Sequence, residues 1–155
     1  MTDKPALTSA TVDDYRTGRH VVYRLHAHVV LVTKYRRSPI TDRVRKLLIE
    51  TTREVCERHG VSLVEADGES DHLHLVVDYP PKVSLSILVG AIKTNTSRRV
   101  REQNWPEARA KLWGEHFWSP SYFAVSTGGA PLEAVRQYVR EQRQPNKKPG
   151  RPKTT

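Results

Sequence analysis

The sequence contains a single cysteine, Cys56, among its 155 residues. One cysteine excludes an internal disulfide framework and any zinc site with several cysteine ligands. Long apolar runs are also missing, and a run such as Val29 to Val32 is far too short to span a bilayer. The opening residues Met-Thr-Asp-Lys include no apolar segment of the secretory type, so we expect a cytoplasmic protein with no membrane partner. The sequence has no P-loop, no GxSxG elbow and no internal repeat.

Acidic residues are few relative to basic ones, with 17 Asp plus Glu against 26 Lys plus Arg and a formal net charge of +9. Such an excess favours a polyanionic partner, with nucleic acid first among them. Hydrophobic residues make up 37% of the chain, enough to build a core and to exclude wholesale disorder. We predict one domain over residues 19–144, preceded by a flexible lead-in (1–18) and followed by a basic disordered tail (145–155).

Hydrophobic periodicity predicts an α+β fold. The spacing predicts strands over residues 21–33, 61–66, 71–79 and 122–127, and helices over residues 42–59, 84–103 and 131–143. Thr41 or Asp42 can cap the first helix and Gly60 can end it. Residues 104–121 lack periodicity and are predicted to form a loop. The order β-α-β-β-α-β matches the ferredoxin-like, RRM-like pattern, an antiparallel sheet with helices on one face, and a further C-terminal helix follows.

Two histidines, His72 and His74, alternate with leucine in the predicted strand over 71–79. Side chains of a strand alternate between faces, so the leucines point toward the helices and both imidazoles point away from them, with Cβ atoms roughly 6 to 7 Å apart. Two imidazoles at that separation can bind one divalent metal ion, or they can be two solvent-facing histidines. His26 and His28 have the same spacing on the first strand. Spacing alone does not choose between the two pairs, and both can face the same side of the sheet.

Tyr138 and Gln142 lie four residues apart in the predicted final helix, which puts them on one helix face. A tyrosine there can act as a nucleophile and a glutamine as an oxygen ligand. Alternatively, Tyr138 packs with Leu132, Val135 and Val139 along an apolar stripe of the helix. The aromatic-rich segment over 111–123 can stack nucleobases or fill the core. Both interpretations of each feature remain open on the residues alone.

Together these parts resemble the single-tyrosine HUH transposases, the TnpA enzymes of the insertion sequence 200/605 family. The resemblance covers roughly residues 21–144 and is carried by several motifs in the same order. The motifs are Thr33-Lys34-Tyr35-Arg36, Asp71-His72-Leu73-His74-Leu75, Leu112-Trp113-Gly114, Trp118-Ser119-Pro120-Ser121-Tyr122 and the Tyr-x-x-x-Gln pair at Tyr138 and Gln142.

The resemblance implies a transposase that cuts and rejoins single-stranded DNA at transposon ends carrying hairpins, through a 5′-phosphotyrosine bond. It implies Tyr138 as the nucleophile, and His72, His74 and Gln142 as ligands of Mg²⁺ or Mn²⁺. His28 matches a histidine common on the family's first strand, where we expect a supporting role. The aspartate-led strand thus favours the second histidine pair as the ligands.

The resemblance also implies a homodimer in which the tyrosine helix of one subunit completes the histidine pair of the other. Gly128-Gly129, before that helix, fits a hinge for this exchange and equally a plain turn. Five basic residues are candidate phosphate contacts, and each can instead be a solvated surface charge. They are Arg36, Arg37, Lys93, Arg98 and Arg99.

Three other functions remain open at this point. A rolling-circle initiator or relaxase also uses a histidine-pair strand and a tyrosine, but such enzymes are usually longer. A domesticated relative would act on chromosomal repeats, and DNA flanking the gene would distinguish it from a mobile element. A noncatalytic single-strand-binding domain would use aromatic side chains on the sheet face, where this sequence has histidines.

Overall fold

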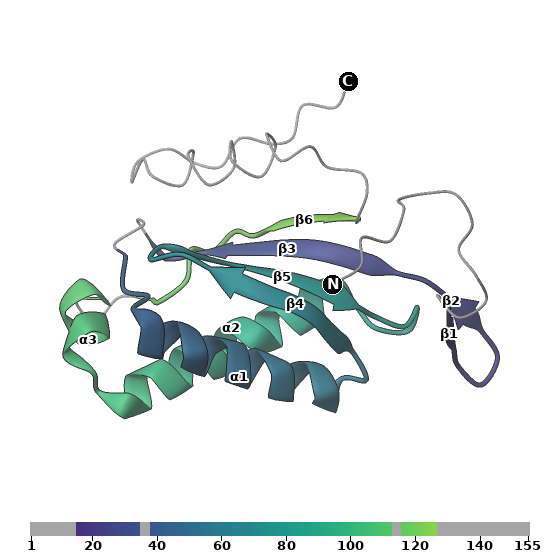
Figure 1. Ribbon diagram of the computed structural model, residues 1–155, viewed down its shortest axis with the longest axis horizontal. Coiled ribbons are helices and arrows are strands. Elements are labelled where there is room, and N and C mark those ends of the chain that lie inside the picture. Colours follow the sequence, from purple (N-terminus) through teal and green to yellow (C-terminus); the bar gives the residue numbers. More distant parts are fainter. Residues whose placement is uncertain (1–14, 35–37, 113–115, 127–155) are drawn as a thin grey trace, which may run out of the picture.

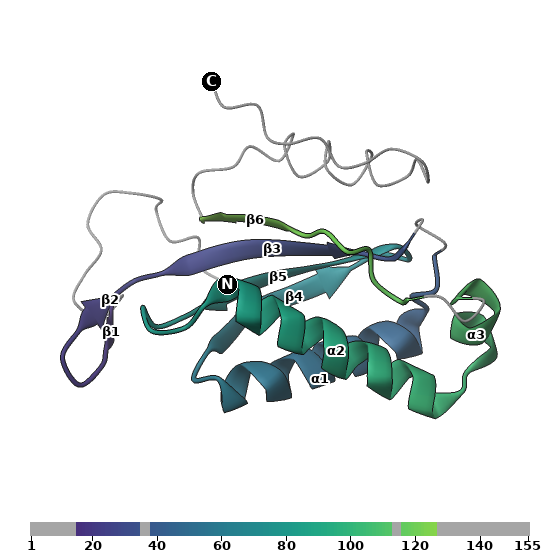
Figure 2. The same cartoon turned by 180° about the vertical axis from the view of Figure 1, so that it is seen from behind.

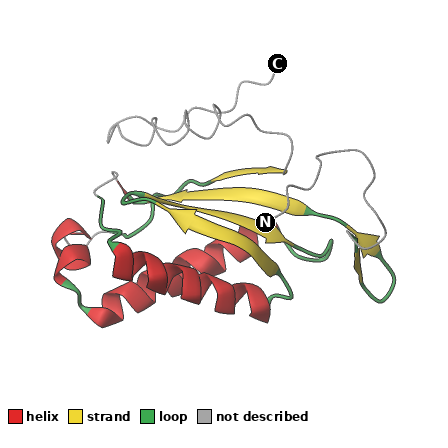
Figure 3. Cartoon of the chain, viewed as in Figure 1, coloured by secondary structure: helices red, strands yellow, loops and turns green. Residues whose placement is uncertain are grey.

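The computed structural model describes residues 15–34, 38–112 and 116–126. These residues form a four-stranded antiparallel sheet, two long helices, one short helix and a small two-stranded hairpin (Figures 1 and 3). The predicted α+β class, with an antiparallel sheet, is confirmed. The strands are β1 (Arg16–Thr17), β2 (Val22–Tyr23), β3 (His26–Val32), β4 (Ser62–Gly68), β5 (His72–Asp78) and β6 (Phe123–Ser126), and the helices are α1 (Asp42–Arg58), α2 (Leu85–Gln103) and α3 (Pro106–Leu112).

The main sheet has the strand order β4-β5-β3-β6, and each neighbouring pair is antiparallel. Helices α1 and α2 lie side by side along one face of this sheet (Figure 2). The core fills the space between the two layers, because alternate residues of β3 and β5 point toward the helices. These residues are Ala27, Val29 and Leu31 of β3 and Leu73, Leu75 and Val77 of β5, all at most 3% exposed.

Local sequence signals set the ends of the two long helices. The Thr41 side chain accepts a hydrogen bond from the Val44 amide at the start of α1, and Ser84 caps α2 in the same way. After α1, Gly60 adopts a φ of +69°, a left-handed conformation that costs glycine little. The boundaries predicted for both helices are therefore confirmed to within about a residue. None of the described helices is long and apolar enough to cross a membrane.

The segment over 104–121 differs from the predicted loop, because residues 106–112 form α3. Pro106 stands at the first position of this helix and Glu107 in its first turn, both favourable there. Glu107 also accepts two hydrogen bonds from the Arg43 guanidinium of α1, each 2.6 Å long. Arg43 in turn stacks on the Trp105 ring, 4.6 Å from its centroid. Tertiary contacts thus fix a helix too short to show a clear period in the sequence.

The start of the described chain also differs from the prediction. Residues 16–17 form β1 within the expected lead-in, and the single strand expected over 21–33 is divided into β2 and β3. The Arg16 side chain donates a 2.6 Å hydrogen bond to Asp78, a buried carboxylate at the end of β5, which ties the hairpin to the main sheet. The predicted final helix over 131–143, the tail, and the candidate residues Arg36, Arg37, Tyr138 and Gln142 lie outside the described residues.

Candidate functional site

The two histidines of β5 lie on the face of the sheet opposite the helices. Leu73 and Leu75, between and after them, are fully buried in the core, so the pleat directs His72 and His74 to the other side. The two imidazole rings are stacked with centroids 6.4 Å apart. The alternation predicted from the sequence is confirmed, and the rings are close enough for nitrogens of both to approach one ion.

A neighbouring carboxylate holds one of these rings. Asp71 Oδ1 lies 2.8 Å from His72 Nδ1, and the Asp71 residue is only 6% exposed. The Asp71 main-chain carbonyl is fixed too, because it accepts hydrogen bonds from the Thr33 amide (2.9 Å) and the Thr33 hydroxyl (3.1 Å) at the end of β3. A carboxylate at Nδ1 favours the tautomer that carries its proton there, which leaves Nε2 as the nitrogen that can bind a metal ion.

Acidic side chains extend this end of the strand into a wider donor group. Glu69, Asp71 and His72 each offer one ligand atom, and these atoms lie within 4.8 Å of one another. Within the described part of the chain, this is the group of three that meets that criterion. Imidazole and carboxylate donors suit a divalent cation, so the residues present fit such an ion. Sequence reasoning missed Glu69 and Asp71 as contributors, although their positions before the histidines were a readable signal.

The first-strand histidines divide between two environments. His28 lies on the same face as His74, and their rings meet edge to face with centroids 5.6 Å apart. His26 lies farther along β3, opposite Asp78 in register, with Nε2 3.4 Å from the Asp78 carboxylate. Both pairs therefore face the same side, and His28 alone of the first pair touches the second. Burial is the main cause that lowers the pKa of His28, His74 lowers it further, and Glu65 opposes the shift.

Lys93, a candidate phosphate contact, is bonded within the protein. Its ammonium donates hydrogen bonds to the carbonyl oxygens of Ser119 (2.8 Å) and Ser121 (3.0 Å), and it lies 5.7 Å from the centre of the Tyr122 ring. Burial lowers the pKa of this amine. Lys93 projects from α2 and fastens the segment before β6, so the structure does not bring it together with the histidine pair.

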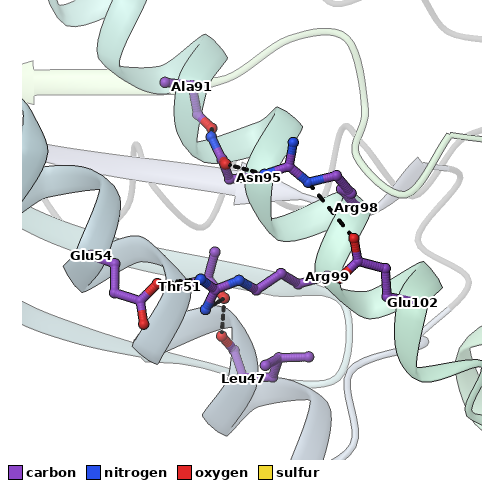
Figure 4. Close-up of polar contacts among 8 residues, drawn as sticks. All are labelled: Leu47, Thr51, Glu54, Ala91, Asn95, Arg98, Arg99 and Glu102. Carbon is purple, nitrogen blue, oxygen red and sulfur yellow. Dashed lines mark hydrogen bonds and ion pairs between the residues drawn. The ribbon is translucent and has the colours of Figure 1, made fainter.

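Arg98 and Arg99 also lie on α2, on the helix-bearing side of the sheet (Figure 4). Arg99 bridges to α1, where it donates to the Glu54 carboxylate and to the Thr51 hydroxyl. Arg98 is more exposed and is paired along its own helix with Glu102, at 3.9 Å. Neither guanidinium approaches the face that carries His72 and His74, so their predicted phosphate contacts would form at a separate surface.

Two aromatic residues of the segment, Phe117 and Trp118, belong to the core. Phe117 is 1% exposed and Trp118 5% exposed, and their rings pack edge to face. The Trp118 indole donates a 2.9 Å hydrogen bond to the Thr96 hydroxyl of α2. Residues buried in this way cannot stack nucleobases, so the core-filling interpretation holds for both aromatic side chains.

The arrangement is therefore a histidine pair on the sheet face opposite the helices, with one ring held by a buried carboxylate and a third imidazole beside the other. The family model described as "Transposase IS200 like" matches residues 21–142, most of the chain. The chain belongs to this family. IS200-like transposases cut and rejoin DNA, and the histidine strand, Tyr138 and Gln142 all fall inside the matched region.

Similar proteins point the same way. The chain is 26% identical over 129 residues to the ISDra2 transposase TnpA of Deinococcus radiodurans, and the aligned region covers 83% of this chain and 91% of that protein. It is 28% identical over 134 residues to the transposase for insertion sequence element IS200 of Salmonella typhimurium, covering 86% and 87%.

Two solved structures share the fold. The first is described as a candidate transposase from Deinococcus radiodurans R1, with a TM-score of 0.74, 28% identity, and coverage of 82% of this chain and 97% of that one. The second is a REP-associated tyrosine transposase bound to a REP hairpin, with a TM-score of 0.51, 12% identity, and coverage of 81% and 70%. The second likeness concerns the fold alone.

Proposed function

We propose that this IS200-like transposase cuts and rejoins single-stranded DNA at transposon ends through a covalent bond to Tyr138. His72, His74 and Gln142 would hold a divalent metal ion, and residues 19–144 would form the transposase domain. One observation carries the proposal: His72 and His74 share the sheet face opposite the helices, and Asp71 holds the His72 ring at Nδ1. Family membership supplies the chemical context, because transposases break and reform phosphodiester bonds.

The proposed step is a transesterification. The Tyr138 oxygen attacks the scissile phosphorus, the bond from phosphorus to the 3′ oxygen breaks, and that oxygen leaves with a proton as a free 3′-hydroxyl. The product is a 5′-phosphotyrosine bond, which conserves the phosphodiester energy, so rejoining needs no nucleotide cofactor. Tyrosine has an ordinary pKa of about 10, so the site must assist loss of its proton.

The residues around the phosphate would orient it and offset its charge. A bound divalent ion supplies Lewis-acid stabilisation of the phosphate oxygens. Two imidazole nitrogens and one amide oxygen suit Mn²⁺ somewhat better than Mg²⁺, which prefers oxygen donors throughout, and either ion is compatible with the proposal. Asp71 would keep His72 in the ligating orientation throughout the cycle.

The DNA partner is proposed to be single-stranded, with a hairpin near each cleavage site. Of the candidate phosphate contacts, Arg36 and Arg37 are favoured, because they follow β3 at the end where Val32 pairs with His72. Lys93 and Arg99 already bond to protein groups, which weakens their candidacy. A noncatalytic single-strand-binding role loses support from the burial of Phe117 and Trp118.

The active form is proposed to be a homodimer in which Tyr138 of one subunit serves the histidine pair of its partner. Mixing two inactive variants tests this directly. Neither His72→Ala nor Tyr138→Phe alone would form an adduct, whereas mixed dimers carrying one subunit of each would regain one complete site. Absence of any recovery after subunit exchange would indicate that each subunit completes its own site.

The central test is formation of a covalent adduct. The chain is incubated with single-stranded DNA containing the transposon ends and Mn²⁺ or Mg²⁺, and the products are separated on a denaturing gel. We expect an adduct of protein and DNA that is lost with Tyr138→Phe, while hairpin binding is retained. We expect His72→Ala to lose metal-dependent cleavage. Adducts that persist in the tyrosine variant would exclude Tyr138 as the nucleophile.

A further inference from the structure

His28 has a buried polar atom without a partner. Among the residues described by the structure, the His28 Nε2 and the Asp78 Oδ1 are the buried side-chain atoms that make no hydrogen bond. The Asp78 carboxylate is otherwise engaged, since its second oxygen contacts Arg16 and His26. The His28 ring has no such engagement. A buried polar atom left unsatisfied lowers stability and calls for an explanation, and a ligand that binds later is one.

The position of His28 places this nitrogen in the candidate site. His28 lies in the middle of β3, which runs between β5 and β6, opposite Val76 on one side and Val125 on the other. Facing residues of paired strands share a face, so the His28 imidazole stands on the same surface as His74. Val30 is the residue of β3 that pairs with His74, and His28 lies two residues from it. The facing residues Val76 and Val125 offer it no hydrogen bond, and Glu65, which pairs with Val76 on the same face, makes none with it among those the structure gives. The 5.6 Å ring contact with His74 leaves His28 beside the proposed metal ligands.

The chemistry of the His28 ring restricts what it can bind. An imidazole that carries its proton on Nε2 offers an N–H donor at that atom. On a face where an anionic phosphate is cleaved, the missing partner of such a donor is an oxygen of the substrate.

We propose that His28 contacts the scissile phosphate, with its Nε2–H donating a hydrogen bond to one non-bridging oxygen. This inference rests on the proposed function, because it needs the phosphate to reach the histidine face. The contact would orient the phosphate and stabilise the charge that develops on its oxygens during attack. His28 is thus a substrate-contacting residue, distinct from the two ligands on β5.

Amide substitutions can separate this role from simple packing. Glutamine places its amide nitrogen near the position of Nε2, whereas asparagine places its amide near Nδ1. We therefore expect His28→Ala and His28→Asn to slow adduct formation about 10- to 100-fold, the range for loss of a hydrogen bond to a charged group. We expect His28→Gln to recover part of the rate. His26→Ala is the matched control, because it removes an imidazole from the same strand and face, and it should stay within about threefold of the wild type.

Phosphorothioate DNA identifies the atom that is contacted. Single-turnover rates are measured for wild type and His28→Ala on DNA carrying sulfur at each of the two non-bridging positions of the cleaved phosphate. We expect one stereoisomer to slow the wild type, with a markedly smaller penalty in His28→Ala. The wild type and His28→Ala are compared on the same isomer with the same metal, so the metal's own preference for oxygen over sulfur affects both rates equally. Equal penalties in both proteins at both positions would overturn the proposal.

Metal affinity and stability separate the remaining alternatives. Mn²⁺ binding, followed by electron paramagnetic resonance, should change less than twofold in His28→Ala, and the urea midpoint should not fall. A large loss of Mn²⁺ affinity would make His28 a ligand and overturn the assignment, and a slow rate explained by unfolding would do the same. If the wild type forms no adduct, the proposed function itself fails, whereas an active wild type with a fully active His28→Ala refutes this inference alone.

Discussion

Replacing Asp71 by alanine removes the side chain that, among the residues the structure describes, hydrogen-bonds a proposed metal ligand. The lost contact is the 2.8 Å hydrogen bond from His72 Nδ1 to a carboxylate that is itself buried. The main-chain carbonyl of residue 71 would still accept from Thr33, so the strand ends should remain joined. The variant therefore frees the His72 ring to rotate and to change tautomer while leaving its position in β5 intact.

The magnitude follows from the class of contact. Loss of an outer partner of a metal-binding histidine lowers metal affinity by about 10- to 100-fold. Because this bond is short and shielded from water, we expect about 30-fold, equivalent to about 2 kcal/mol of binding free energy. Asp71→Asn keeps an acceptor oxygen at the same position without the charge, and it should fall between alanine and the wild type.

The assay is titration of the full chain with Mn²⁺, followed by calorimetry or paramagnetic resonance, with urea unfolding as the test of integrity. Glu69→Ala is the comparison variant, since Glu69 lies in the same donor group but has no side-chain hydrogen bond to His72 among those the structure gives. We expect Glu69→Ala to lose less affinity than Asp71→Ala, because it leaves the His72 ring held. Equal losses in both variants would mean that the carboxylates bind the ion directly on the Nδ1 side. Unchanged affinity in Asp71→Ala would refute the positioning role.

Two further predictions concern residues outside the histidine face. Lys93→Met should lower the free energy of unfolding, measured in urea, by about 2 kcal/mol, because it removes a charged donor from two carbonyl oxygens. Arg98→Met, on the exposed side of the same helix, is the control and should have almost no effect. Equal effects would contradict the structural role of Lys93. Burial raises the pKa of the Cys56 thiol to about 11, so at pH 8 only about one thiol in a thousand is ionised. A thiol reagent should then modify the protein in urea and leave the folded protein unmodified, and rapid labelling of the folded chain would contradict this burial.

The sequence predicted the parts of the fold that depend on local signals. Thr41 and Gly60 mark the ends of α1 by chemistry that acts within a few residues, a cap hydrogen bond and a left-handed backbone. The alternation around His72 and His74 likewise follows from the strand repeat alone. Such features do not depend on what packs against them, so the residues themselves are enough to predict them.

Features that depend on distant partners could not be predicted in the same way. The helix α3 is held by an ion pair across 64 residues of sequence, between Arg43 and Glu107. Lys93 looked like a free cation because its two carbonyl acceptors come from a segment with no regular period. The different surroundings of His26 and His28 depend on strand pairing, which brings His28 beside His74 and His26 beside Asp78.

The net charge of +9 can now be divided among parts of the chain. Several basic side chains of the described helices and strands lie within ion-pair distance of acids, so they add little to the field that attracts DNA. The described ranges nevertheless contain 16 basic and 11 acidic residues and so carry +5 of the +9, and the remaining +4 belongs to the other parts of the chain. Arg36 and Arg37 follow the strand end nearest His72, and the segment over 145–155 has four basic residues and no acid. Attraction by that segment would be sensitive to salt and independent of DNA sequence, so specificity must be supplied by contacts closer to the histidines. The ion pairs are Arg16–Asp78, Arg43–Glu107, Arg45–Asp42, Arg98–Glu102 and Arg99–Glu54.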